Sequence, residues 1–172
     1  MFLRHPFLWY KGKIMHVGIG YDVHPLISDR KLVLGGVVIP FAKGLAGHSD
    51  ADVLVHAVID ALLGAAGLGD IGEHFPDTAP AFKDISSLKL LVKTCDLISG
   101  KGFAVQNIDA TIFAEAPKLS PYKAAMQKNI ARIIEIKPDR VNVKAKTFEG
   151  LGMIGKGEGI AALCVALLTS VV

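Results

Sequence analysis

The chain has 172 residues, of which 51% are hydrophobic and 20% are charged, and its formal net charge is +3. This length fits one domain with a substantial core, and the composition excludes the fibrous and disordered classes. Residues 1–15 hold Arg4, Lys11 and Lys13 and no acidic residue, so the remainder balances 16 basic against 16 acidic side chains. A balanced body has no bulk attraction for nucleic acid or for a membrane surface, and neither partner is expected.

The sequence predicts neither export nor membrane insertion. We expect residues 1–14 to form a flexible N-terminal extension, with Met15 as an alternative start, and residues 15–172 to form one domain. The apolar patch in the extension lacks a small-residue cleavage site, and no apolar run reaches the ~18–20 residues of a transmembrane helix. Cys95 and Cys164 are isolated in apolar runs, which favours free thiols in a reducing compartment and hence a cytoplasmic protein.

Strands and helices are predicted from the spacing of apolar side chains and from the Gly and Pro residues between them. Gly35-Gly36 separates two β-branched runs, which is typical of a tight hairpin turn. Residues 48–50 suit the N-cap region of a helix, and Pro121 suits the first position of another. The last run fits a strand or a helix, and a strand is favoured because the sheet needs a closing member. In chain order we expect a strand at 16–24, two short strands within 31–41, a helix within 47–72, a loop at 69–80, a helix at 86–100, a strand at 103–116, a helix at 121–136, a strand at 140–147, a glycine-rich loop at 150–159 and a strand at 160–172.

This order of elements predicts an α+β fold. We expect a two-layer sandwich in which a mixed β-sheet is covered by helices on one face. The chain offers no obvious cover for the other face of the sheet. Self-association is therefore expected, because an apolar sheet face must be buried against something.

The helix within residues 47–72 carries two stripes at i, i+4 spacing. One stripe is apolar, whereas the other comprises Asp52, His56 and Asp60. A surface helix usually carries Lys and Glu on its polar face. This helix instead presents the residue types that bind metals and transfer protons, which marks it as a candidate for chemistry.

A metal site is predicted from this helix and the first strand. Asp22 and His24 lie on the same side of an extended segment, because side chains alternate with period two. With His56 they form a His₂Asp set, which suits Zn²⁺ with an open fourth position, as in catalytic sites. Asp52 and Asp60 are candidates to orient the second nitrogen of His56. The alternatives are that Asp22 and His24 belong to an ordinary turn and that the two helix carboxylates cap or solvate the helix.

Two further segments are suited to bind anions. His48 and Ser49 lie at a helix N-terminus, where free N–H groups and a partial positive charge attract phosphate. Residues 116–118, Ala-Pro-Lys, form a turn before a helix, where backbone groups and Lys118 could grip a phosphate or a nucleobase. The alternatives are plain N-capping by Ser49 and a simple connector at 116–118.

A fourth segment, residues 146–149 with the sequence Lys-Thr-Phe-Glu, precedes a glycine-rich loop that contains Lys156. This is not a Walker P-loop, because Gly157 follows Lys156 where Ser or Thr is required. Residues 150–155, GLGMIG, have the glycine spacing of a dinucleotide fingerprint but lack the strand before it and the helix after it, so that interpretation is rejected. Together the four segments indicate phosphate chemistry on a metal.

Five sequence blocks in one order carry a resemblance to a known family. These blocks are GYDVHPL, GHSDADVLVHAVIDALLGAAGLGDIGEHFPDT, NIDATIFAEAPKLSP, VNVKAKTFEGLG and GKGEGIA. From His16 to Val172 the chain resembles the 2-C-methyl-D-erythritol 2,4-cyclodiphosphate synthases of the non-mevalonate isoprenoid route. The resemblance implies a homotrimer whose sheets pack around a central axis, with three active sites at the subunit interfaces.

The resemblance also implies a reaction. The 2-phosphate of 4-diphosphocytidyl-2-C-methyl-D-erythritol 2-phosphate attacks the β-phosphorus of its own diphosphate, CMP leaves, and a cyclic diphosphate forms. No protein nucleophile is needed, because the enzyme folds a small cytidine diphosphate substrate back on itself and neutralises its charge. One Zn²⁺ per subunit and a Mg²⁺ or Mn²⁺ bound with the substrate are the implied cofactors.

Site residues carry over by motif. Asp22, His24 and His56 match the zinc ligands, and Glu149 matches the residue that holds Mg²⁺ or Mn²⁺. His48 and Thr147 match donors that steady the transition state and are the implied catalytic residues. The residues implied to contact the substrate are Asp22, His24, His48, Ser49, Asp70, Ile71, Gly72, Phe75, Pro76, Asp77, Thr78, Ala114, Ala116, Pro117, Lys118, Leu119, Ser120, Lys146, Thr147, Phe148, Glu149, Met153 and Lys156.

Two positions depart from the family pattern. Lys146 stands where Thr is common, and Lys156 stands where Arg is often found. A lysine keeps the positive charge but loses the bidentate geometry that an arginine offers to phosphate.

Two alternatives to the cyclase remain. A zinc-dependent phosphohydrolase would use the same three ligands to activate water and would release inorganic phosphate from simple esters. A non-enzymatic trimeric ligand-binding module would use the histidine and aspartates of the helix for structure alone.

Overall fold

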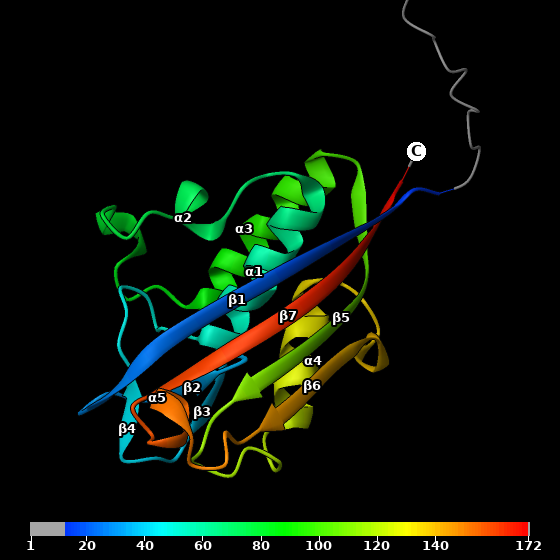
Figure 1. Cartoon of the computed structure of the whole chain (residues 1–172). Helices are drawn as coiled ribbons and strands as arrows, with labels where there is room; N and C mark the ends of the chain where they lie inside the picture. Colours follow the sequence, from blue (N-terminus) through cyan, green and yellow to red (C-terminus); the bar gives the residue numbers. More distant parts are fainter. Residues whose placement is uncertain (1–12, 172) are drawn as a thin grey trace, which may run out of the picture.

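The structure is a computed structural model that describes residues 13–171. Most of the predicted extension, residues 1–14, lies outside the described residues. Figure 1 shows two layers, with the long strands of a sheet in front and helices behind them. No helix within residues 13–171 has the length and apolar character needed to cross a membrane.

The described elements alternate between strands and helices along the chain. The strands are β1 (Met15–Ser28), β2 (Leu32–Leu34), β3 (Val37–Ile39), β4 (Lys43–Leu45), β5 (Phe103–Phe113), β6 (Val141–Lys146) and β7 (Gly159–Ser170). The α-helices are α1 (Val53–Ala66), α2 (Ile71–His74), α3 (Ser87–Gly100), α4 (Lys123–Ile133) and α5 (Gly152–Gly155), and the 3₁₀ helices are η1 (Pro80–Phe82) and η2 (Pro138–Arg140).

Five strands form one mixed sheet in the order β4-β1-β7-β5-β6. β1 pairs antiparallel with β4 and β7, and β5 pairs antiparallel with β7 but parallel with β6. Helices α1, α3 and α4 lie on the same side of this sheet (Figure 1). The α+β prediction of a mixed sheet with helices on one face is therefore confirmed.

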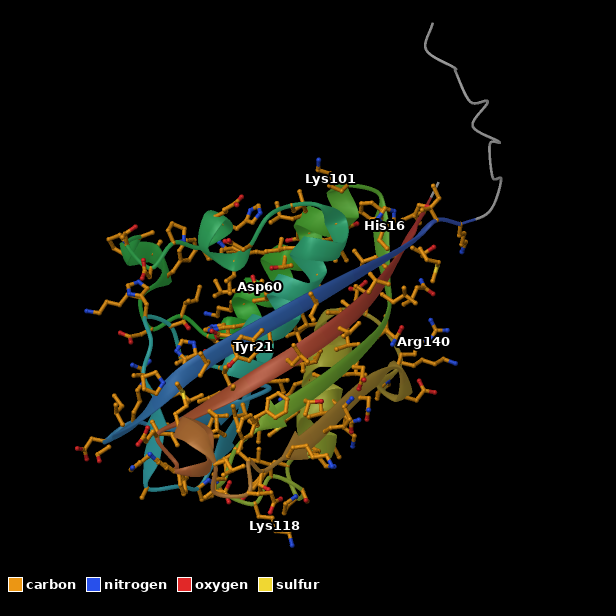
Figure 2. All side chains as sticks on the ribbon, viewed as in Figure 1. His16, Tyr21, Asp60, Lys101, Lys118 and Arg140 are labelled. Atoms are coloured by element: carbon orange, nitrogen blue, oxygen red, sulfur yellow. The ribbon has the colours of Figure 1, made fainter. Side chains whose placement is uncertain are left out.

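The opposite face of the sheet is uncovered and largely apolar along β1. Val17, Ile19 and Tyr21 are 69%, 68% and 57% exposed, because side chains of a strand alternate between the two faces. Figure 2 shows Tyr21 on the face turned away from the helices. On the same face, Asp109 of β5 and Lys144 of β6 form an ion pair of 2.6 Å. The chain therefore leaves this row of apolar side chains uncovered, as the sequence predicted.

Several predicted boundaries were wrong, each for a local reason. α1 begins after Asp52, not at residues 48–50, because the Asp52 carboxylate accepts the Val55 N–H at 3.1 Å. α4 begins at Lys123, and Pro121 precedes it in a turn closed by the Tyr122 N–H to Leu119 C=O hydrogen bond at 3.0 Å.

Short elements were also missed. The predicted loop at 69–80 contains the one-turn helix α2, the glycine-rich loop contains α5, and β4 was not predicted. Each spans three or four residues, which is too short for a period of apolar side chains to develop. The terminal strand β7 and the Gly35-Gly36 hairpin turn are confirmed, and the φ angles of the two glycines are 58° and 69°.

Helix α1 packs directly against β1 because two glycines leave no side chain between them. A Cβ at Gly18 would lie 2.0 Å from the carbonyl oxygen of Ala61, and one at Gly20 would lie 2.1 Å from that of Ala57. Real Cβ atoms do not approach backbone this closely, so only glycine permits the observed packing. This contact sets the distance between α1 and β1.

Asp52 joins this helix to the β2–β3 hairpin. Its fully buried carboxylate accepts N–H groups from Gly35 at 2.9 Å, Gly36 at 2.7 Å and Val55 at 3.1 Å. Burial raises the pKa of Asp52 to about 6, against the lowering effect of the Gly36 and Gly35 N–H groups. The carboxylate therefore organises the hairpin turn at the cost of a desolvated charge.

We expect Gly20→Ala to lower the free energy of unfolding by about 1–3 kcal/mol, because the added methyl must push α1 away from β1. Urea denaturation measures this change. The matched control is Gly100→Ala in α3, where nothing lies within 4 Å of the added Cβ. Equal stability of the two variants would contradict the close packing.

The pKa of Asp52 predicts a pH-dependent difference in stability between the wild type and Asp52→Asn. A raised pKa in the folded state means that the contribution of Asp52 is fully present below its unfolded pKa and is lost as the pH rises through about 6. The stability of the wild type relative to the variant should therefore fall by about 3 kcal/mol at most between pH 4 and pH 7.

Urea titrations of both proteins across this range measure the difference. The hydrogen bonds that asparagine fails to make give a constant offset, so only the slope tests the pKa. A difference that is flat between pH 4 and pH 7 would show that Asp52 titrates as an exposed carboxyl.

Candidate functional site

Three side chains from β1 and α1 converge on one point. The Oδ2 atom of Asp22 lies 2.9 Å from His24 Nε2 and 2.9 Å from His56 Nδ1, and the two nitrogens are 3.1 Å apart. A tetrahedral Zn²⁺ with ligand bonds of about 2.0–2.1 Å would set its ligand atoms roughly 3.3 Å apart. The spacing of these three atoms is therefore close to what a metal would impose. Within residues 13–171, this is the cluster of His and Asp groups that could hold a metal ion.

The glycine contacts explain why the strand and the helix meet at this point. Gly18 faces Ala61 and Gly20 faces Ala57, so the strand and the helix run in opposite directions. Two residues further along β1, Asp22 therefore reaches the helical turn that carries His56. The prediction that Asp22, His24 and His56 share one site is consistent with this geometry.

Both histidines have their other ring nitrogen bound to a protein oxygen. His24 Nδ1 lies 2.7 Å from the Ala46 carbonyl oxygen, and a carbonyl can only accept, so this nitrogen carries the proton. His56 Nε2 lies 2.9 Å from Ser87 Oγ and 3.1 Å from Ser49 Oγ. The Nε2 atom of His24, which faces Asp22, is then free to bind a cation, whereas a serine hydroxyl can donate to or accept from His56 Nε2.

Charge interactions within this cluster favour the ionised carboxylate. Burial alone would raise the pKa of Asp22, but hydrogen bonds and charge interactions with His24 and His56 outweigh it and hold the pKa well below its usual range. Burial alone would lower the pKa of His24, but the hydrogen bond and charge of Asp22 outweigh it and raise that pKa. The ionised Asp22 carboxylate thus favours a positive charge on the neighbouring histidines.

A cavity of about 450 Å³ opens beside Asp22, His24 and His56. It is lined by Asp22, His24, Gly47, His48, Ser49, His56, Ile71, Gly72, Phe75, Pro76, Asp77, Phe82 and Leu90. The structure therefore brings together most of the residues that were predicted near the metal and the erythritol, from the segment before α1 and from the 70–78 loop. His48 and Ser49 lie before the N-cap Asp52, so the prediction that they form the N-terminus of the helix was wrong. Asp70 does not line the cavity and instead caps α2, where its Oδ1 accepts the Glu73 N–H at 3.0 Å.

The second predicted group lies elsewhere, at the ends of β5 and β6. The Ala114 N–H donates to the Lys146 carbonyl at 3.0 Å, and the Thr147 hydroxyl donates to Glu149 Oε1 at 2.7 Å. Figure 2 places Lys118 at the lower edge of the molecule, well below Asp60 of α1. The members of this group are Ala114, Ala116, Pro117, Lys118, Leu119, Ser120, Lys146, Thr147, Phe148, Glu149, Met153 and Lys156, none of which lines the 450 Å³ cavity.

The prediction that Asp52 and Asp60 orient His56 was wrong. Asp52 turns away from His56 to cap α1 and to bind the hairpin turn. Asp60 accepts the Ile71 N–H at 2.8 Å and so fastens the 70–78 loop to the helix. A carboxylate one helical turn from a histidine is within reach of it, but backbone N–H groups of neighbouring segments satisfy both of these carboxylates first.

Sequence reasoning missed several residues of the site. Phe82 and Leu90 line the cavity with apolar surface, and Ser87 binds His56. Arg30 donates to the Gly47 carbonyl at 2.9 Å and to the Ser49 carbonyl, and so holds the segment before α1 in place. These residues come from segments far apart in the chain, and no spacing in the sequence marks them.

Leu119 lies in the hydrophobic core and is 4% exposed, so only its backbone is available to a ligand. Glu149 has a φ of 51°, an unusual value for a residue other than glycine. Such conformations are often found at functional sites, where the surrounding structure holds them. This is consistent with a functional role for the segment 146–149.

The profile of one protein family matches residues 15–169 of this chain, under the description YgbB. The chain belongs to the YgbB family. It is 62% identical over 154 residues to the 2-C-methyl-D-erythritol 2,4-cyclodiphosphate synthase of Pelotomaculum thermopropionicum, covering 90% of this chain and 95% of that protein. The predicted membership of the cyclodiphosphate synthase family is therefore confirmed.

Solved structures of this family share the fold. The bifunctional IspDF of Campylobacter jejuni superposes with a TM-score of 0.89 at 46% identity, covering 92% of this chain and 43% of that one. IspF of Plasmodium falciparum, in a complex with CDP, superposes with a TM-score of 0.80 at 33% identity, covering 91% of this chain and 96% of that one. Each superposition covers more than nine-tenths of this chain, so the fold as a whole is shared with both structures.

We expect purified protein to hold about one zinc ion per chain, as a His₂Asp set with an open position does. His56→Ala should remove it, since two remaining ligands bind Zn²⁺ too weakly to survive dialysis. Elemental analysis by mass spectrometry measures the content. His74→Ala is the matched control, because His74 lies outside the cavity and its Nε2 binds the Leu68 carbonyl at 2.7 Å. Equal zinc in the two variants would show that the metal sits elsewhere.

Proposed function

We propose that this chain is a cyclase of the non-mevalonate isoprenoid route, a phosphorus–oxygen lyase. Its substrate is 4-diphosphocytidyl-2-C-methyl-D-erythritol 2-phosphate, and its products are 2-C-methyl-D-erythritol 2,4-cyclodiphosphate and CMP. The proposal rests on the convergence of Asp22, His24 and His56 beside a cavity, in a chain that is 62% identical to a synthase of that name. A further support is the CDP bound by the Plasmodium falciparum relative.

The three converging atoms fit Zn²⁺, with one ion per subunit. Two imidazole nitrogens and one carboxylate oxygen are ligands that zinc prefers, and the cavity leaves the fourth position open to a phosphate oxygen. When bound there, the ion would supply Lewis-acid polarisation of a phosphate group. Glu149 is the proposed ligand of Mg²⁺ or Mn²⁺ that arrives with the substrate.

The cavity suits the erythritol part of the substrate. Ile71, Phe75 and Leu90 offer apolar surface to its methyl group, and Asp77 offers a carboxylate to its hydroxyls. His48 lies at the cavity wall, where its Nε2 donates to the Ala79 carbonyl at 3.3 Å. We propose that Asp70, Gly72, Pro76 and Thr78, which lie in the same loop as Ile71, also contact the erythritol part. Ser49 is proposed to contact the phosphate end of the substrate.

The second group of residues, at the ends of β5 and β6, suits the cytidyl and diphosphate parts of the substrate. Backbone groups of Ala114, Ala116, Pro117, Lys118, Leu119 and Ser120 are proposed to read the base. Lys146, Thr147, Phe148, Glu149, Met153 and Lys156 are proposed to bind the diphosphate and its surroundings. Thr147 would donate a hydrogen bond to the charge that develops on the transferring phosphate once its hydroxyl turns from Glu149 to the substrate, and His48 would donate one once its Nε2 turns from the Ala79 carbonyl. By holding both ends of the substrate, the two groups would contribute much of the rate enhancement.

Because the two groups lie apart within one chain, we propose that a homotrimer completes each site at a subunit interface. The exposed apolar row of Val17, Ile19 and Tyr21 supports packing of the sheets around a common axis. Residues 15–172 would form the single domain of each subunit. The cytoplasm is the proposed compartment, which suits the free thiols of Cys95 and Cys164.

CMP release from the cytidyl substrate tests the function. We expect stoichiometric CMP and cyclic diphosphate with Mg²⁺ present, and no inorganic phosphate, because the attacking group is part of the substrate. Chromatography with phosphorus NMR separates the products. Release of inorganic phosphate from simple esters would favour the zinc-dependent phosphohydrolase. Zinc-loaded protein that yields neither product would favour the ligand-binding module.

Mixing two inactive variants tests the shared site. His56→Ala and Glu149→Gln should each be inactive alone, because each damages a different half of every site. In co-expressed mixed trimers, about a quarter of the interfaces should join two undamaged halves and recover that share of the activity. CMP release from the purified mixture measures the recovery.

Trimers of the His56→Ala variant alone, at equal protein concentration, are the control. If the mixed variants stay inactive although mass spectrometry shows that they share trimers, then each site is built from one chain.

A further inference from the structure

The Nε2 atom of His56 lies against buried serine hydroxyls. His56 is 9% exposed, and the serines on its Nε2 side, Ser49 and Ser87, are 7% and 0% exposed. Ser87 Oγ lies 2.9 Å from His56 Nε2, and Ser49 Oγ lies 3.1 Å from the same nitrogen. Ser87 is the first residue of α3, so this contact joins the metal-binding cluster to a helix that carries none of its ligands.

The hydroxyl proton of Ser87 is committed to Asp50. Ser87 Oγ donates to Asp50 Oδ1, and the Ser87 backbone N–H lies 3.1 Å from each oxygen of the same carboxylate. The carboxylate also accepts the Asp52 N–H at 3.3 Å, and the Asp50 N–H donates to the Ile85 carbonyl at 3.0 Å. Asp50 is therefore held from both sides, against the N-terminus of α3 where a negative charge is stabilised.

This commitment decides the tautomer of His56. A serine hydroxyl has one proton, so Ser87 Oγ faces His56 Nε2 with a lone pair and accepts from it. His56 then carries its proton on Nε2, and its Nδ1 presents a lone pair to Asp22 and His24. Ser49 cannot make this choice alone, because its hydroxyl proton can also turn toward Ser87 Oγ, 3.4 Å away, and its oxygen already accepts the Ala51 N–H at 3.1 Å.

We propose that Asp50 and Ser87 are positioning residues, in which Asp50 orients the Ser87 hydroxyl and Ser87 holds His56 with Nδ1 free for the metal ion. This inference rests on the proposed function only in taking the His56 cluster as a zinc site. The arrangement follows the general rule that an oxygen acceptor on the outer nitrogen orients a metal-binding histidine. His24 is oriented by the Ala46 carbonyl, which no substitution can remove, whereas the orientation of His56 depends on two side chains that can be changed.

The test compares the zinc affinity of the full-length wild type with that of four variants, by competition with a chromogenic chelator. Ser87→Ala should weaken zinc binding by about 10–100-fold, and Ser87→Thr should restore it because the hydroxyl is kept. Asp50→Asn should also weaken it, because an amide group can donate to Ser87 and turn the serine proton toward His56. Ser86→Ala is the matched control, since Ser86 makes no side-chain capping hydrogen bond.

A second readout separates orientation from general damage. In ¹⁵N NMR of the zinc-loaded protein, the wild type should show a slowly exchanging Nε2 proton on His56. Ser87→Ala and Asp50→Asn should lose its protection, whereas Ser87→Thr should keep it. Should Ser87→Ala fail to fold, Asp50→Asn and Ser87→Thr carry the comparison.

Wild-type zinc affinity together with a protected Nε2 proton in Asp50→Asn, or in a folded Ser87→Ala, would overturn the proposal. Failure of the proposed function is distinguishable, because a wild type that binds zinc but releases no CMP leaves these affinities measurable. A loss in Ser86→Ala as large as that in Ser87→Ala would also overturn it, since the effect would then belong to the start of α3 as a whole.

Discussion

The direct contact between the backbones of α1 and β1 is the constraint on which the candidate site depends. Gly18 and Gly20 place no side chain between the helix and the strand, so the Ala57 and Ala61 carbonyls come within van der Waals distance of β1. The separation of the two elements is then set by backbone and not by flexible side chains. His56 can reach Asp22 only because this separation is small, and any larger residue at the two glycine positions would move the ligands apart.

The same contact forces polar groups into an apolar setting, and the structure satisfies each of them. α1 is buried on nearly every side, yet it carries His56, and Asp52 caps its first turn. Asp52 meets three backbone N–H groups, and the outer nitrogen of His56 meets two serines. Burial would otherwise make these groups costly, so the hairpin turn and the start of α3 are as much a part of the site as the ligands are.

The two groups of proposed site residues lie at different parts of the sheet. One group surrounds the end of β1 and the 70–78 loop, and the other follows β5 and β6, with β7 between them in the sheet. In the proposed function a single copy would hold an incomplete set of substrate contacts, and it leaves Val17, Ile19 and Tyr21 exposed. Packing of the sheets of several copies would bury this apolar row and would also bring the two groups of neighbouring copies together.

The sequence by itself determined the family, the α+β class, the hairpin at Gly35-Gly36 and the residue types of the metal-binding cluster, because these follow from local spacing and motif order. It could not show that Asp52 and Asp60 bind backbone N–H groups instead of His56, nor that Ser87 and Asp50 orient that histidine. Those partners come from segments 11 to 37 positions apart in the chain. Only the tertiary structure decided them, because a polar side chain binds whichever donor or acceptor the packed backbone brings within about 3 Å, and spacing along the chain does not encode that distance.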